Sequence, residues 1–186
     1  MAISKDAILG DPPAAKARWT LDKLLKGAGP DADPTEIDVP ATRIVVRKTA
    51  DETVNNSSTL QNDDHLILPL GANEVWIFQF FLFSNSSTTA DIKIAFTAPT
   101  GAVFQYLISS ADIGVDSSTT TATFARMSTG AINIYGESLD KLDILRGLVI
   151  NGANAGNLQL QWAQSLAEVS DTIVRANSCL IATKIA

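Results

Sequence analysis

The stretch VWIFQFFLF, residues 75–83, limits what this 186-residue chain can fold into, because eight of its nine residues are apolar. Successive side chains of a β-strand point to opposite faces, so one face would carry Trp76, Phe78, Phe80 and Leu82. The other face would carry Val75, Ile77, Phe81 and Phe83, interrupted by Gln79. Only one face can fill the core of a single domain. The other would expose an apolar patch that soluble monomers rarely show.

Two explanations of the second face stay open. Another copy of the chain buries it, which makes Val75, Ile77, Phe81 and Phe83 an oligomer interface. At ~1.5–3 kcal/mol for each of the four side chains, burial contributes roughly 6–12 kcal/mol before the cost of association. Alternatively, the N-terminal part of the same chain folds back over it. We favour the oligomer.

The sequence from residue 41 to residue 186 predicts an all-β domain. Nine or ten short apolar or alternating segments follow one another, separated by turns rich in glycine, asparagine and serine. No helical pattern of ten residues interrupts them. The profile is typical of a β-sandwich of the jelly-roll kind. The predicted core consists of Trp76, Phe78, Phe80, Ile92, Ile94, Phe96, Leu158, Leu160 and Trp162.

Residues 1–40 are expected to form a separate docking arm and linker. An aspartate and two prolines at 11–13 are able to start a helix that Gly27 ends, although an extended arm fits equally well. The glycines and prolines of 27–40 indicate a semi-rigid linker. The residues expected to dock the arm are Trp19, Leu21, Leu24 and Leu25.

Charge and hydropathy exclude several classes of partner. The net charge of −6 argues against a nucleic-acid partner, because an acidic chain is repelled by phosphates. No apolar run approaches the 18 residues of a membrane helix, and the first residues lack the apolar core of a secretory signal. We therefore expect no membrane partner and no export by a signal peptide.

No catalytic, metal-binding or cofactor-binding set emerges from the sequence. Asp63, Asp64 and His65 are expected to form a surface turn of solvated carboxylates, with a calcium site at Asp63 or Asp64 as the minor alternative. A zinc site lacks ligands, because the chain has one histidine and one cysteine. Cys179 is expected to be a small buried residue. Stacking of sugars on Trp76 and Trp162 is less favoured than core packing, because both lie within predicted strands.

Several segments resemble a known group of proteins. They are VVRKTADETVNNSSTLQNDD (45–64), DIKIAFTAPTGA (91–102), GLVINGANAGNLQLQWAQ (147–164) and NSCLIATKI (177–185). Together they resemble bacteriophage virion structural proteins of the jelly-roll minor tail, tail-fibre and decoration type, over residues 45–185. The motifs are structural and not catalytic. The resemblance implies compact jelly-roll modules that assemble as trimers, and residues 18–40 resemble the connectors of phage fibre domains.

The resemblance implies a non-enzymatic virion protein made in the host cytoplasm. The first expectation is a homotrimeric capsid decoration or cement protein, attached by its N-terminal arm to other virion proteins such as the major capsid protein. The alternative is a tail-fibre, spike or minor tail module. Such a module would bind a host receptor or glycan through the polar loops at 84–91 and 114–123.

Overall fold

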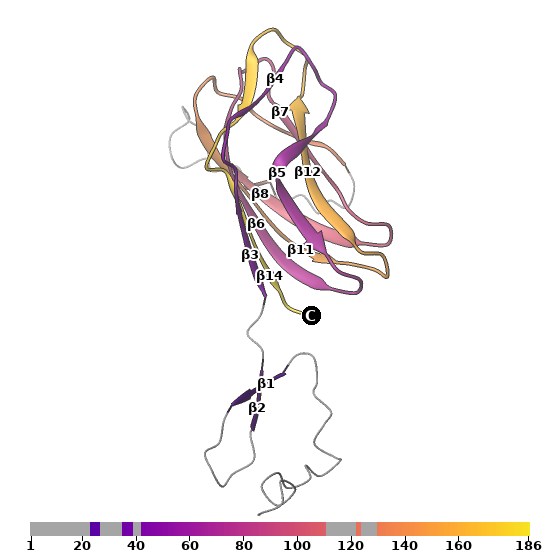
Figure 1. The fold of residues 1–186 in the computed structure, drawn as a ribbon. Coiled ribbons are helices and arrows are strands. Elements are labelled where there is room, and N and C mark those ends of the chain that lie inside the picture. The colour runs from indigo at the N-terminus through magenta and orange to yellow at the C-terminus, as the bar shows by residue number, and fades with distance from the viewer. Residues whose placement is uncertain (1–22, 27–34, 39–41, 111–121, 124–129) are drawn as a thin grey trace, which may run out of the picture. The chain divides into compact units, whose positions relative to one another are not determined.

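The computed structural model describes residues 23–26, 35–38, 42–110, 122–123 and 130–186 (Figure 1). The chain divides into two compact units, Met1–Pro40 and Ala41–Ala186. All regular elements among the described residues are strands. In this part of the chain no helix is long and apolar enough to cross a membrane.

The first unit contains a short antiparallel pair of strands. β1 (Lys23–Lys26) pairs with β2 (Thr35–Asp38), with Lys23 opposite Asp38 and Lys26 opposite Thr35. The helix expected through Leu24 and Leu25 is therefore wrong there, and the expected linker at 27–40 contains a strand. A short isolated helix is marginal in water, whereas a paired strand satisfies its backbone groups on a partner. Trp19 and Leu21 lie outside the described residues.

The second unit consists of two antiparallel sheets. The smaller sheet has the order β10 (Ile132–Ile134), β7 (Ile92–Thr97), β12 (Gly156–Gln164) and β5 (Gln61–Leu70). The larger sheet has the order β3 (Arg43–Arg47), β14 (Cys179–Lys184), β6 (Val75–Asn85), β11 (Lys141–Ile150), β8 (Val103–Ser110) and β9 (Ala122–Thr123). β13 (Asp171–Val174) joins it by pairing with β6 and with β4 (Glu52–Asn55).

The strand order is that of a jelly roll. Along the chain, β5, β7, β10 and β12 belong to the smaller sheet, and the strands that alternate with them, β6, β8, β9 and β11, belong to the larger one. Each sheet thus holds four strands of a double Greek key, in the orders β5-β12-β7-β10 and β6-β11-β8-β9. β3 and β14 extend the larger sheet beyond β6. The expectation of an all-β jelly-roll-like sandwich is confirmed.

The core lies between the inner faces of the two sheets. Each of the nine residues expected there is at most 7 % exposed. The aromatic rings of the core meet at an angle. The Phe80 and Phe96 rings are tilted, with centroids 5.3 Å apart, and the rings of Phe96 and Tyr106, another core residue, meet edge to face, with centroids 5.0 Å apart. Phe78 also packs against Gly147 of β11, where an added Cβ would lie 2.2 Å from the carbonyl oxygen of Gln105 and 2.8 Å from the Phe78 ring. Glycine is therefore required at position 147.

Candidate functional site

The outer face of the larger sheet is the candidate site. Antiparallel pairing aligns outward-pointing residues of five strands in rows that run across the sheet. The three central rows are Arg47, Cys179, Phe81, Ile144 and Ser109; then Val45, Ile181, Gln79, Arg146 and Leu107; then Arg43, Thr183, Ile77, Leu148 and Gln105. Two shorter rows, Val75, Ile150 and Val103, and Phe83 and Leu142, complete what we call the outer face.

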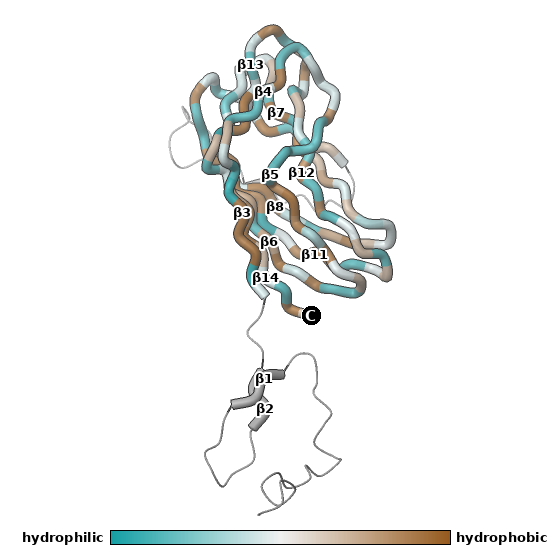
Figure 2. The backbone as a smooth tube through the Cα atoms, in the orientation of Figure 1, coloured by the Kyte–Doolittle hydropathy of each residue, from teal (hydrophilic) through white to brown (hydrophobic). Residues whose placement is uncertain are grey.

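Large apolar side chains on the outer face are exposed to solvent. Ten large hydrophobic residues among the described residues are exposed, and five of them belong to this face: Val45, Ile77, Phe83, Val103 and Ile150, at 60, 46, 39, 55 and 49 %. Figure 2 shows that hydrophobic residues predominate along the middle of β3, β14 and β6, with inward and outward positions coloured alike. Exposed apolar side chains gathered on one face of a sheet are a feature of interaction sites.

The four residues expected to form an oligomer interface all lie on the outer face. Ile77 and Phe83 are exposed, whereas Val75 and Phe81 are half-buried within the single chain. Sequence reasoning missed Val45, Val103 and Ile150, which widen the face beyond one strand. The alternation of RIVVR in β3, with Ile44 and Val46 inward, carried the signal for Val45. The interface itself stays a prediction.

An open hollow of about 730 Å³ lies at the centre of the outer face. Its walls include Ile77, Leu107, Leu148 and Ile181, with Gln79, Gln105, Thr183 and Arg146 as polar members. Tyr106 also lines it, but its ring points to the core, where it packs against Phe96 and where burial raises the pKa of its hydroxyl to about 12. The hollow thus offers apolar walls beside neutral donors and one guanidinium, a lining suited to an apolar side chain with carbonyl or carboxylate neighbours.

The charges of the outer face differ in sign from that of the whole chain. Arg43, Arg47 and Arg146 occupy three positions in its rows, and none of the positions in those rows is an aspartate or glutamate. The chain as a whole carries a net charge of −6. The outer face is therefore apolar and basic on an acidic protein, and it attracts acidic surfaces.

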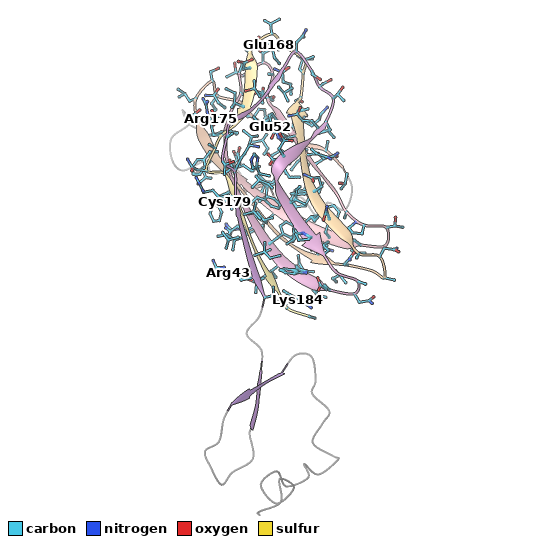
Figure 3. All side chains as sticks on the ribbon, viewed as in Figure 1. Arg43, Glu52, Glu168, Arg175, Cys179 and Lys184 are labelled. Carbon is cyan, nitrogen blue, oxygen red and sulfur yellow. The ribbon has the colours of Figure 1, made fainter. Side chains whose placement is uncertain are left out.

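Cys179 lies on the outer face between Phe81 and Arg47 (Figure 3). It is half-buried, where the sequence suggested a buried residue. Partial burial raises the pKa of the thiol, so at neutral pH it is the protonated form that packs against its neighbours. Cys179 thus contributes apolar area to the outer face.

The triplet 63–65 is not a solvated turn, and this expectation is wrong for Asp63. Asp63 is 1 % exposed within β5, whereas Asp64 is exposed. The pairing of β5 with β12 shifts here, so that residues 62 and 67 of β5 face residues 161 and 159 of β12. The bulge adds residues to β5, breaks the simple alternation and turns Asp63 inward. Among the described residues, no group of three or more His, Cys, Asp or Glu side chains could hold a metal ion.

Asp63 belongs to a cluster of three charged side chains inside the domain, in which Lys48 contacts both carboxylates. Lys48 Nζ lies 2.9 Å from Asp63 Oδ2 and 2.5 Å from Glu52 Oε2. The Lys48 and Asp63 side chains are both 0 % exposed. The side chain of Glu52, labelled in Figure 3, is 14 % exposed. We call Lys48, Glu52 and Asp63 the buried triad. The inward parity of Lys48 after Ile44 and Val46 is the sequence signal that could have revealed it.

Comparisons with known proteins identify no family. No family model matches the chain, and no curated protein matches it. Solved structures of infectious bursal disease virus align weakly. The Gt strain structure is 9 % identical in sequence, with a TM-score of 0.20, and the match covers 88 % of this chain and 42 % of that chain. The VP2 subviral particle is 10 % identical, with a TM-score of 0.21, and the match covers 86 % of this chain and 44 % of that chain. The chain spans less than half the length of these structures. The jelly-roll assignment therefore rests on strand order.

Proposed function

We propose that this protein is a non-enzymatic structural protein of a virus particle and that it assembles with copies of itself through the outer face. The observation that carries the proposal is the exposed apolar outer face, with Val45, Ile77 and Val103 among its members. The jelly-roll strand order and the resemblance of residues 45–185 to phage virion proteins support the same reading. In finer terms, we propose a homotrimeric capsid decoration protein attached by residues 1–40.

The charge of the outer face favours a ring over a two-fold dimer. A two-fold contact centred on the hollow would bring Arg146 beside its own copy, and like charges in contact are unfavourable. In a closed ring of three, each subunit contacts its neighbour through two different patches. A basic apolar face against a different, acidic surface of the next subunit satisfies both charge and burial.

The energy available from the outer face is enough for association. Ile77 and Phe83 are about half covered already, so each gains about half of the ~1.5–3 kcal/mol of full burial. Burial of Val45, Val103 and Ile150 on association adds comparable free energy for each residue. These three contributions make up for the smaller ones of Val75 and Phe81, which are already half-buried in the single chain. The surplus that remains after association costs sets the affinity.

A tail-fibre or spike module is the second candidate. It is supported by the separation of Met1–Pro40 from Ala41–Ala186, which fits a connector joined to a head domain. Labelled protein distinguishes the two candidates, because a decoration protein binds capsids that lack it, whereas a fibre module binds host cells. Binding to cells that is competed by a host glycan, with none to capsids, would replace the first candidate by the second.

We expect Ile77→Asp and Phe81→Asp each to convert the oligomer to single chains, because a carboxylate would be desolvated in the interface. The absolute mass in solution, measured by light scattering, gives the result directly. Val169→Asp is the matched control, since Val169 is 78 % exposed but lies outside the outer face. An oligomer that survives both substitutions with its fold intact contradicts the assignment.

The absolute mass of a shortened chain that begins at Ala41 shows whether another copy of the chain or residues 1–40 cover the outer face. All strands of the jelly roll lie within Ala41–Ala186, so this unit keeps its core. We expect it to remain an oligomer. If the full chain is a monomer and the shortened chain associates, residues 1–40 cover the outer face instead.

A further inference from the structure

The buried triad contains an amine and a carboxyl group held in contact out of water. Lys48 is among the largest side chains that are fully buried, and its Nζ lies 2.9 Å from Asp63 Oδ2. Lysine is almost never fully buried unless it is paired. The two groups come from different segments, Lys48 after β3 and Asp63 from the bulge of β5, so the contact joins parts of the fold that are distant along the chain.

The two oxygens of Asp63 have different environments. Oδ1 accepts hydrogen bonds from the backbone N–H groups of His65 (2.9 Å) and Leu66 (2.8 Å), while Oδ2 faces Lys48 Nζ. The bulge frees these two N–H groups from the ladder with β12 and aims them at one oxygen. Two converging backbone donors stabilise negative charge on a carbonyl oxygen under nucleophilic attack.

Glu52 contacts the amine of Lys48 and is held in place by further hydrogen bonds. Its Oε2 is 2.5 Å from Lys48 Nζ and accepts a hydrogen bond from the backbone N–H of Asp64 (3.2 Å). Its Oε1 accepts a hydrogen bond from Gln61 Nε2 (2.8 Å). A carboxylate fixed on both oxygens and touching the amine is placed to take up its protons and to return them.

We propose that Lys48 and Asp63 condense to form an intramolecular isopeptide bond, with Glu52 as the proton carrier. Lys48 Nζ attacks Cγ of Asp63, a Nζ–Cγ bond forms and the Cγ–Oδ2 bond breaks. The ammonium and carboxylate together become an amide and one water molecule. Two protons leave Nζ for Oδ2, relayed by Glu52, and no oxidant, reductant or cofactor takes part. This chemistry does not depend on the proposed virion role.

The surroundings favour the amide over the ion pair. Burial favours the neutral amine of Lys48, but the hydrogen bonds to Glu52 and Asp63 raise its pKa above the usual 10.5, so Lys48 starts as an ammonium and the reaction begins with proton transfer from it. Held in contact, the two groups react as one molecule, and exclusion of water favours condensation. The product also removes two buried charges, which are costly to desolvate. Its carbonyl keeps the His65 and Leu66 donors, and its N–H is left with Glu52 as acceptor.

A second buried pair in the same domain lacks this arrangement. Lys141 and Asp143 are neighbours on β11, and Nζ lies 3.6 Å from Oδ1. Lys141 Nζ is instead bound by the carbonyl oxygen of Tyr135 and by Ser110 Oγ. Oδ2 of Asp143 accepts a hydrogen bond from the Ser84 hydroxyl at 3.1 Å. This pair serves as the internal control.

Mass spectrometry of the denatured full chain tests the bond. Proteolysis after glutamate cuts at Glu36, Glu52 and Glu74, which places Lys48 in fragment 37–52 and Asp63 in fragment 53–74. We expect one joined species, lighter by one water than the two fragments together, and an intact chain lighter by one water than its sequence. Two separate fragments at full mass, from a folded and purified chain, would overturn the proposal.

Three variants assign the roles. Lys48→Arg should restore the full intact mass, because its guanidinium does not form the amide, and Lys141→Arg should leave the loss of water unchanged. Glu52→Gln keeps both reacting groups but removes the proton carrier, so we expect the full mass. A Glu52→Gln chain that loses water as fast as the wild type refutes the role of Glu52, and a Lys48→Arg chain that still loses one water refutes Lys48 as the nucleophile. Because the bond forms only when folding holds Lys48 and Asp63 in contact, circular dichroism first shows that each variant is folded, and its mass is then read after denaturation.

Discussion

Replacing Phe80 by alanine should lower the free energy of unfolding by about 3–5 kcal/mol, because the change opens a cavity at the centre of the core. The Phe80 side chain is 0 % exposed and its ring packs against those of Phe78 and Phe96, at centroid distances of 5.8 and 5.3 Å. Urea denaturation at one fixed protein concentration measures the change, since association shifts the apparent stability of an oligomer.

Tyr135→Ala is the matched control for this experiment. The Tyr135 side chain is 75 % exposed, so loss of its ring leaves no cavity, and surface changes usually alter stability by less than about 0.5 kcal/mol. Equal losses for both variants would mean that Phe80 does not fill a closed core. The inward face of β6 would then be misassigned, and with it the outward position of Ile77 and Phe83.

The two-faced nature of β6 was predictable because period-2 alternation follows from strand geometry alone. Trp76, Phe78 and Phe80 point to the core, and Val75 and Ile77 point away from it, as the sequence pattern requires. Sandwich class followed in the same way from short alternating segments between turns. Strand order did not, because several pairings of antiparallel strands bury the same faces.

The buried triad escaped sequence reasoning for a physical reason. Strand alternation predicts that Lys48 points inward, whereas its charge predicts that it is exposed to solvent. The second prediction is usually correct, because a buried charge is costly unless a partner compensates it. The partner, Asp63, is turned inward by a bulge that depends on the register of β5 against β12, which is a tertiary property. A single sequence shows neither the register nor the neighbour, so Asp63 and Asp64 looked alike.

The outer face was predicted in part. Its central strand is conspicuous because aromatic residues occupy both parities of 75–83. Val45, Val103 and Ile150 belong to strands that look ordinary alone, and they become one surface only when β3, β6, β8, β11 and β14 align side by side. Its basic character emerges in the same way, from arginines on β3 and β11.

Asp63→Ala should lower the free energy of unfolding by about 3–5 kcal/mol, which is typical when one partner of a buried ion pair is removed. Lys48 would lose its fully buried partner, and the N–H groups of His65 and Leu66 would lose their shared acceptor. Urea denaturation measures the loss. Asp64→Ala is the control, because Asp64 is the exposed neighbour and its removal should change stability little.

Replacing Lys48 and Asp63 together distinguishes the destabilisation caused by an unpaired buried charge from the stabilisation that the buried triad provides. Lys48→Met combined with Asp63→Asn removes both charges and keeps an Oδ1 acceptor for the N–H groups of His65 and Leu66, and replacing a buried ion pair by uncharged residues of similar volume is often neutral or stabilising. If Lys48 and Asp63 form only an ion pair, the double variant should recover most of the stability lost in Asp63→Ala. If they are joined by an amide, the double variant also loses a cross-link across 15 residues, worth about 3 kcal/mol by the loop-closure estimate. Its stability then stays below that of the wild type by about that amount.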